Sequence, residues 1–501
     1  MEKTSAPQSI KLLVGFFIIL ILSLGYFQGQ AFWSLRQLPK KFDLRETNRV
    51  PSLREQAWGT CWIFATYLSL ESDLLRTGVW TASGELGPVA LAQYHLDKYS
   101  GFTRKGDDSH VNDTWYSGQG TRFPGSNTDD LNSGLIVHLG GDFLAATAYL
   151  TNTKGAVQAR LTPVIPRKGD HQLFGDLPTE GVLLENDYRY YFPRKVEWLS
   201  LNGSELEKRQ RIKEAIVNYG AVASSQVMKP EPLAIAKNGL EIHGSLDETE
   251  KINHAINLIG WDDSIRFGHH RGAWLVQDSD HRIEETGEPL GVFYVLYDDL
   301  FAAKDPWMGG VIFRDVVVAP FDRVYSHALH GFRYQTAGDP RVKKIAVKYD
   351  LVSREEFVGV GLYSLTPNNS FKLSLKTDLK TESSILTIEG EIETPGFHFQ
   401  DLPFLAYEGE VFVVLELEDQ SYAYDASFMM EVLLGGLPEW GKPIEVRSKA
   451  ALDEGHYFDA NGEWHDFSSY IHPYNEQRQV PHAKEAPTAS PSLNLYTRKA
   501  P

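Results

Sequence analysis

The sequence predicts an α+β fold in two domains, the first mixing helices with short antiparallel strands and the second built of strands alone. The chain has 501 residues, which is too long for one core because single cores stop growing at roughly 250–300 residues. Helical and strand patterns alternate over residues 40–320. Over residues 321–470 the pattern becomes one of regularly spaced strands, which is typical of an all-β sandwich.

The composition is that of a folded, acidic protein. Hydrophobic residues make up 42% of the chain and aromatic residues 12%, enough apolar surface to offset the entropy of the chain. The formal net charge is -17. Nucleic-acid partners require basic stripes, and the sequence has none, so we expect no nucleic-acid partner.

Residues 1–31 have the form of an export signal. Lys3 and Lys11 precede an apolar run from Leu12 to Phe27, and Gly29-Gln30-Ala31 has the small-x-small form of a cleavage site. The alternative is a retained membrane anchor, for which the run is short. In either case we expect the rest of the chain to be extracytoplasmic, whether secreted, periplasmic or anchored at the cell surface, with membrane contact only through an uncleaved N-terminal segment.

Within residues 40–320 the sequence predicts helices over Cys61 to Leu75, Phe143 to Leu150 and Arg211 to Tyr219, from helical spacing of apolar residues. Short apolar runs bounded by Gly, Asp or His predict strands of an antiparallel, barrel-like sheet. These strands are Ala221 to Val227, Ile256 to Gly260, Ala273 to Gln277 and Val292 to Tyr297. The rest of residues 101–193 is rich in Gly, Asp, Asn, Thr and Pro and predicts long loops.

Within residues 321–470 the alternation of apolar and polar residues predicts six strands. They are Lys343 to Tyr349, Phe357 to Tyr363, Phe371 to Leu375, Ser384 to Glu389, Val411 to Leu417 and Phe428 to Leu433. Residues 471–501 are polar, contain several prolines and show no period, and they predict a disordered tail.

The single cysteine lies where its chemistry can be used. Cys61 starts a predicted helix, and a helix N-terminus stabilises a thiolate. Gln56 lies five residues before it. Its amide can point to the same place as the Cys61 backbone N–H, which would make a two-donor oxyanion hole. The alternative is a buried structural cysteine beside two tryptophans, because free cysteines are often small hydrophobic residues.

The run from Gln56 to Ala65 resembles the active-site segment of papain-like cysteine peptidases, in which a Gln, a Gly and a Cys-Trp-x-Phe-Ala run stand in this arrangement. Phe42 to Arg45 looks like the start of that family's mature domain. Gly140-Gly141 looks like the glycine pair whose backbone binds substrate. The chain is most similar to the bacterial subgroup in which a lectin-like domain follows the peptidase. The resemblance implies a helical lobe and an antiparallel β-barrel-like lobe, followed by the sandwich.

The same resemblance implies the general base. Asn253-His254-Ala255 enters an apolar strand as the family's histidine segment does, which makes His254 the candidate. Asp278 stands where the family has an Asn, and a carboxylate accepts a hydrogen bond from imidazole equally well. Asp280 replaces a shielding Trp of the family. Two carboxylates there would repel each other and admit water, so we expect a looser His254.

These observations lead to a cysteine peptidase that acts on protein or peptide substrates through a Cys61 thioester, with no cofactor. His269-His270 has no suitably spaced third ligand, so no metal site is predicted. The alternative is a weak or inactive surface protein that binds glycan or protein. The lectin-like resemblance implies a glycan or cell-surface ligand for the second domain. Four aromatic residues there are candidates for stacking on sugars, with core packing as their other interpretation: Tyr422, Tyr424, Tyr457 and Trp464.

The segment before the first domain is short. Too few residues lie between Ala31 and Phe42 for an occluding pro-segment of the kind that papain-like zymogens carry. We therefore expect control of activity to rest on export, on the long 101–193 stretch or on the second domain.

Overall fold

A computed structural model describes residues 38–56, 59–102, 140–158, 189–280, 291–430, 444–446, 448, 450–471 and 489–500. The predicted export signal lies outside these residues. Within them, no helix is both long enough and apolar enough to cross a membrane.

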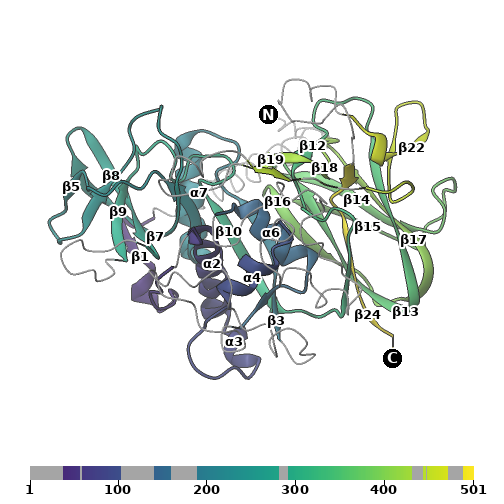
Figure 1. The fold of residues 1–501 in the computed structure, drawn as a ribbon, viewed down its shortest axis with the longest axis horizontal. Coiled ribbons are helices and arrows are strands. Elements are labelled where there is room, and N and C mark those ends of the chain that lie inside the picture. The colour runs from purple at the N-terminus through teal and green to yellow at the C-terminus, as the bar shows by residue number, and fades with distance from the viewer. Residues whose placement is uncertain are drawn as a thin grey trace, which may run out of the picture.

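Helix α2 (Cys61–Thr77) runs through the middle of the molecule (Figure 1). It ends at Gly78, whose left-handed φ of 72° lets its N–H donate to the carbonyl of Leu74 at 3.0 Å. Every residue from Cys61 to Leu74 is buried, because other elements surround the helix. It contacts α4 (Gln93–Tyr99), α6 (Phe143–Asn152) and the strands β4, β7 and β10 (Val222–Gln226, His254–Phe267 and Val311–Val318).

An antiparallel sheet carries β4, β7, β8 and β9 in that order; β8 spans His270–Gln277 and β9 spans Val292–Leu296. All four predicted strands are therefore present. The register pairs Asn257 with Gln277, so the start of β7 lies beside the residues that follow β8. The sheet is covered by α7 (Glu205–Asn218), and together they enclose a second apolar core.

Helix α7 begins six residues before the predicted start. Ser204 forms a capping box with Glu207: the N–H of Glu207 donates to the Ser204 hydroxyl, and the Ser204 N–H donates to the Glu207 carboxylate at 2.7 Å. The prediction was wrong about this end because the first turns are polar and exposed, so they carry no apolar period.

The two parts of the chain share one hydrogen-bonded sheet of 19 strands among the described residues. Strand β3 (Tyr190–Trp198) pairs with β10 of the first part and with β16 (Gly396–Asp401) of the second. Phe192 packs edge-on against Phe321, Phe397 and Phe399 at this junction, with ring centroids 5.0–6.2 Å apart. The predicted boundary at residue 320 lies between β10 and β11 (Arg323–Tyr325).

The second part is built on one long strand, β13 (Lys344–Ser364). Two separate strands were predicted here, and this was wrong. The chain passes through a register shift between Leu351 and Glu355 without leaving the sheet. Strand β13 pairs with β16, β17 (Ala406–Leu417), β21 (Gly455–Phe458) and β24 (Asn494–Lys499). The pair β14 (Asn369–Lys376) and β15 (Leu386–Ile392) extends the sheet beyond β17.

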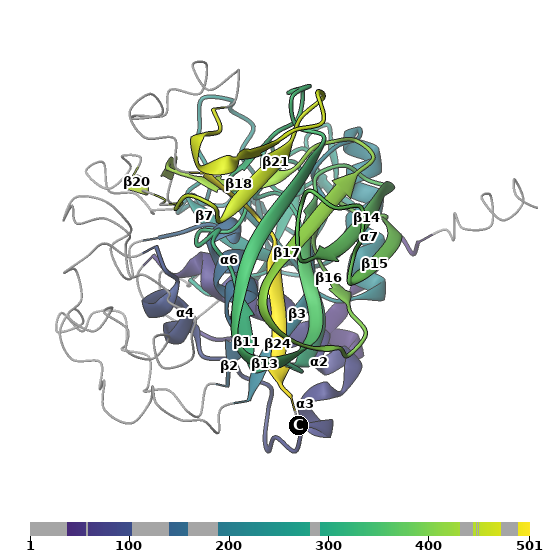
Figure 2. The ribbon, with the colours of Figure 1, turned by 90° about the vertical axis from the view of Figure 1, so that its right-hand side faces the viewer.

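The predicted disordered tail is corrected over its last residues. Ala489–Pro491 forms β23, and Asn494–Lys499 forms β24, which pairs with both β11 and β13 (Figure 2). Leu493 and Leu495 face one core, and Tyr496 faces the other. Both faces of the strand are thus buried, so its sequence lacks the polar alternation that marks a half-exposed strand. Residues 472–488 lie outside the described residues.

Candidate active site

Cys61 is the first residue of α2 and its side chain is buried, with 2% of the residue exposed. The backbone N–H groups of the first turn of a helix point toward its N-terminus, where Cys61 lies. A negative charge on Sγ is favoured there, because the partial positive charge of the helix lies at this end.

His254, the first residue of β7, reaches both Cys61 and Asp278. Its Nε2–H donates to Asp278 Oδ1 at 2.7 Å, and Cys61 is close enough to act on its pKa. Since Nε2 is taken by Asp278, Nδ1 is the ring nitrogen left to exchange a proton with the thiol. Burial lowers the pKa of His254, but the charge and hydrogen bond of Asp278, with a smaller contribution from Cys61, outweigh it and raise this pKa well above 6.5. The imidazolium form is therefore favoured at neutral pH.

Asp278 follows the last residue of β8, and only 4% of it is exposed. Burial acts to raise its pKa, but the charge and hydrogen bond of His254, together with backbone N–H groups, lower it. Those N–H groups belong to Ser279 and Asp280, at 2.6 and 3.3 Å from Oδ1. His254 and Asp278 are both buried and hydrogen-bonded to each other, and the looser His254 expected from Asp280 stays a prediction.

Gln56 is held by the same turn. Its backbone N–H donates to the Ser279 carbonyl at 2.8 Å, and the Ser279 hydroxyl donates to Gln56 Oε1 at 2.7 Å. Because the carbonyl end of the amide is fixed on Ser279, the NH₂ end points away from it. The residue is 3% exposed, so this orientation is kept inside the protein.

Gly140 and Gly141 lie just before α6. Gly140 has a φ of 118°, a conformation that favours glycine. A Cβ atom at Gly141 would overlap the indole of Trp62, the residue after Cys61. The glycine pair therefore lies directly against the segment that carries the thiol.

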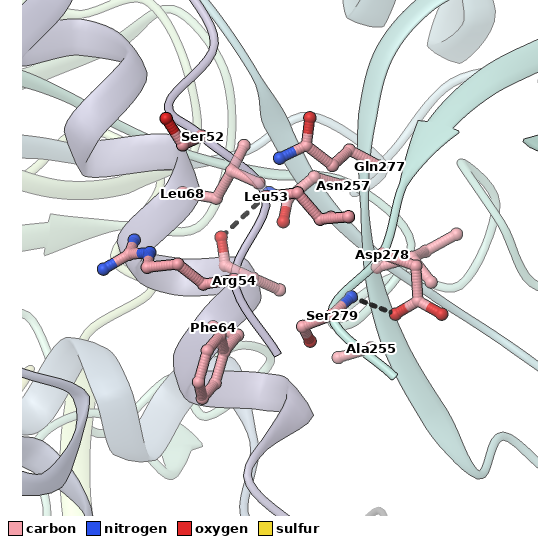
Figure 3. A pocket seen from close by; sticks show the side chains of 12 residues that line it. Ser52, Leu53, Arg54, Phe64, Leu68, Ala255, Asn257, Gln277, Asp278 and Ser279 are labelled. Carbon is pink, nitrogen blue, oxygen red and sulfur yellow. Dashed lines mark hydrogen bonds between the residues drawn. The ribbon is translucent and has the colours of Figure 1, made fainter. Parts of the chain in front are cut away.

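A small pocket lies between α2 and the strands (Figure 3). Phe64 and Leu68 line it from the helix, and Asn257, Gln277 and Asp278 from the strand side. Its cavity volume is only about 20 Å³. Asn257 Nδ2 donates to the carbonyl of Ala65 at 2.8 Å, which ties the helix carrying Cys61 to the strand carrying His254.

The structure therefore brings Gln56, Cys61, His254 and Asp278 together, with Gly140-Gly141 alongside. Sequence reasoning missed Ser279 and Asn257, whose contacts join residues far apart in the chain. No periodic signal marks such residues. Ser279 was visible only as the middle of the unusual Asp278-Ser279-Asp280 run.

Of the remaining candidates, His270 is paired with Asp298 at 2.7 Å. The described residues hold no group of three metal-ligating side chains. Tyr422 and Tyr424 are buried in the core of the second part, so they cannot stack on a sugar. Tyr457 stacks on His465, and Trp464 Nε1 donates to the Leu379 carbonyl at 3.2 Å.

No known family's sequence model matches this chain, and no curated protein matches it in sequence. Solved structures do match. The clostridial cysteine protease Cwp84 after propeptide cleavage covers 92% of this chain and 99% of its own, with a TM-score of 0.64 and 16% identity. The cysteine protease and lectin-like domains of Cwp84, a surface layer associated protein of Clostridium difficile, cover 93% of this chain and 90% of their own, with a TM-score of 0.63 and 16% identity. The chain therefore has the fold of a cysteine protease domain joined to a lectin-like domain.

Proposed function

We propose that this protein is an exported cysteine peptidase that hydrolyses peptide bonds through a thioester on Cys61. One observation carries the proposal: the buried imidazole of His254 hydrogen-bonds to the buried carboxylate of Asp278 at 2.7 Å, and its pKa is raised by that carboxylate and, to a smaller extent, by Cys61. Such an arrangement supports a thiolate–imidazolium pair, which a structural cysteine does not need.

The proposed reaction uses each of these residues in turn. The Cys61 thiolate attacks the carbonyl carbon of the scissile peptide. The Cys61 N–H and the Gln56 amide stabilise the oxyanion that forms. His254 gives its proton to the leaving amine, which breaks the C–N bond and leaves a thioester. His254 then takes a proton from water, and the resulting hydroxide attacks the thioester carbonyl, which breaks the C–S bond, releases the acid and regenerates the Cys61 thiolate beside protonated His254.

The surroundings of the site support a protein or peptide substrate. The glycine pair offers backbone groups beside the thiol, and the resemblance implies that an extended substrate pairs with them. The lectin-like fold of the second part supports a glycan or cell-surface ligand, and the N-terminal segment supports an extracytoplasmic location. These remain proposals for this chain.

Alkylation of Cys61 tests the ion pair directly. We would compare wild type, Cys61→Ser and His254→Ala with iodoacetamide at mildly acidic pH and follow labelling by mass spectrometry. His270→Ala is the matched control, because His270 is also paired with an aspartate but lies beside Phe267, at the opposite end of β7 from His254. Without an imidazolium, a thiol of ordinary pKa is almost wholly protonated at this pH, so His254→Ala should label on the order of 100-fold more slowly.

The result separates the two interpretations of the fold. Fast labelling that depends on His254 and not on His270, with hydrolysis of a peptide library, supports the peptidase. Slow labelling that is indifferent to His254 would contradict it, and the chain would then be a binding protein on a peptidase fold.

A further inference from the structure

We propose that Arg333, from the second part of the chain, positions the Gly140-Gly141 segment of the first part for substrate binding. The inference rests on the proposed function, because it assigns this residue a role in peptide binding. Arg333 does not touch the reacting atoms, so it is a positioning residue.

The contact that carries the inference is an ion pair across the two parts. Arg333 Nη1 lies 3.3 Å from Asp142 Oδ2, and the arginine side chain is only 3% exposed. Asp142 follows Gly141 directly. Among the described residues this is the one carboxylate paired with Arg333, so the buried guanidinium depends on Asp142 for its compensation.

The guanidinium of Arg333 is itself rigidly held. Its Cζ lies 4.6 Å from the ring centroid of Phe102 and 4.3 Å from that of Phe428, so it is stacked by two aromatic rings. Its Nε–H donates to the His330 carbonyl at 3.2 Å, and its backbone N–H donates to the Tyr424 carbonyl at 3.1 Å. A side chain fixed in this way can impose a position on its partner.

The segment around His330 is anchored in turn by the second part. The His330 N–H donates to Asp425 Oδ2 at 3.0 Å, and His330 Nδ1 lies 2.9 Å from the Ser448 hydroxyl. That hydroxyl donates to Asp425 Oδ1 at 2.6 Å. Asp425 lies on β18 (Ala423–Ala426), which pairs with β23. The position of Arg333 is thus set by the sheet of the second part.

Asp142 fixes the position of the glycine pair, because it follows Gly141 directly and is itself held by Arg333. Its Oδ1 accepts the N–H of Ala145 at 2.6 Å and caps α6, while its Oδ2 faces Arg333. Gly141 is packed on the indole of Trp62. The segment is therefore fixed from both sides, by Trp62 next to the thiol and by Arg333 behind it. Shifts of about 1 Å in groups that orient a substrate cost on the order of 100-fold in rate.

Two reagents distinguish this role from a general effect on the site. Iodoacetamide needs only the thiolate, whereas a peptidyl epoxysuccinate must also bind along the glycine pair. We would measure both inactivation rates on full-length Arg333→Met, Asp142→Asn and wild type. Their ratio in one sample cancels any loss of folded protein. Asp142→Asn keeps the helix cap and removes the charge, so it tests the pair if Arg333→Met folds poorly.

Arg194→Met is the matched control. Arg194 also pairs with a carboxylate of the second part, Asp401, and its Cζ lies 5.1 Å from the Phe399 ring centroid, but it lies on β3 away from the glycine pair. We expect the ratio of peptidyl to small-reagent rates to fall about tenfold in Arg333→Met and Asp142→Asn, and to keep its wild-type value in Arg194→Met.

The outcomes separate this inference from the proposed function. An unchanged ratio in Asp142→Asn, in an enzyme whose wild type reacts rapidly with the peptidyl reagent, would overturn the role of Arg333 and leave the peptidase intact. An equal fall in Arg194→Met would also overturn it, since the effect would then be general to the junction. A wild type whose Cys61 reacts slowly with both reagents would overturn the proposed function itself.

Discussion

Asp278 gives His254 a partner that carries a full negative charge. An amide at the same place would accept the same hydrogen bond without the charge. The pKa of His254 is raised because the carboxylate outweighs the effect of burial. In the proposed reaction the imidazole must be protonated when the amine leaves, so the high pKa extends activity toward alkaline pH.

In Asp278→Asn, kcat/KM should therefore begin to fall at a lower alkaline pH than in wild type. The hydrogen bond to His254 Nε2 is kept, but loss of the charge lowers the pKa of His254, and protonated His254 disappears at a lower pH. We expect the alkaline limb of kcat/KM to move down by about one to three pH units, measured with a fluorogenic peptide. Asp298→Asn at the His270 pair is the control. An alkaline limb that stays in place would contradict the assignment.

Ser279→Ala should weaken the oxyanion hole without touching the ion pair. The hydroxyl fixes Gln56 Oε1 at 2.7 Å, so its loss lets the amide rotate. Removing an oxyanion donor outright costs roughly 100- to 1,000-fold in kcat, and loosening one should cost less, about tenfold. The rate of iodoacetamide labelling should not change. Ser279→Thr keeps the hydroxyl and should restore most of the activity; equal losses in both variants would argue against this role.

Helix α2 is fixed in place by polar residues on a helix that is buried all round. Three of them accept backbone N–H groups of neighbouring segments: Ser69 from Phe313 at 3.2 Å, Ser72 from Ala221 at 3.0 Å and Asp73 from Val316 at 2.8 Å. Polar groups in such a position must be paired, because an unpaired one costs about 1–3 kcal/mol. The pairing sets the rotation of α2 and hence the direction of the Cys61 side chain.

Asn257→Ala tests the tie between α2 and β7. The change removes the hydrogen bond to the Ala65 carbonyl and enlarges the pocket in Figure 3. We expect a loss of about 1–3 kcal/mol in the free energy of unfolding, measured with urea, and slower labelling of Cys61 in the folded protein. Asn461→Ala removes an exposed turn contact and should change stability by less than about 0.5 kcal/mol. Wild-type stability and labelling in Asn257→Ala would show that the tie is dispensable.

Much of the element order could be predicted from apolar spacing alone. The helix from Cys61 and the strands that follow Gly220 are found where they were expected, because their burial is one-sided or complete over several residues. Strand β13 was divided in two because its middle, around Arg354, is polar and exposed where the register shifts. Strand β3 was missed because a proline interrupts its run at Pro193.

The two parts of the molecule are joined by pairing between a strand of the first part and a strand of the second. The β3–β16 pairing makes the sheet continuous, and β24 lies between β11 and β13. The sequence did not predict this joining, since which strand edges meet depends on distant pairing that no local pattern encodes. Gln56, Cys61 and His254 could be predicted because they lie in two short local motifs, which the family resemblance joins in one site.

Deletion of residues 489–501 should destabilise the whole protein, because these residues include a strand of its main sheet. Without β24, Thr497 no longer donates to the carboxylate of Glu355, which is 1% exposed, and the edges of β11 and β13 are left open. Exposing a buried sheet edge and its apolar face costs several kcal/mol, comparable to the whole stability of many domains. We expect loss of the cooperative thermal transition and aggregation on gel filtration. Deletion of residues 500 and 501 alone should leave the thermal transition and the gel-filtration profile unchanged. A folded protein that lacks residues 489–501 would contradict this account.

The place of β24 also bears on when the proposed enzyme becomes competent. Asn494 Nδ2 donates to the Thr151 carbonyl at 3.0 Å and to Asn152 Oδ1 at 2.8 Å, at the end of the helix that Asp142 begins. These residues leave the ribosome, and any export channel, after everything else described. A nascent chain with Cys61 and His254 already outside therefore lacks the support of its substrate-binding segment. We expect the order of synthesis to delay proteolysis until residues 494–499 have been made and have folded, later than Cys61 and His254.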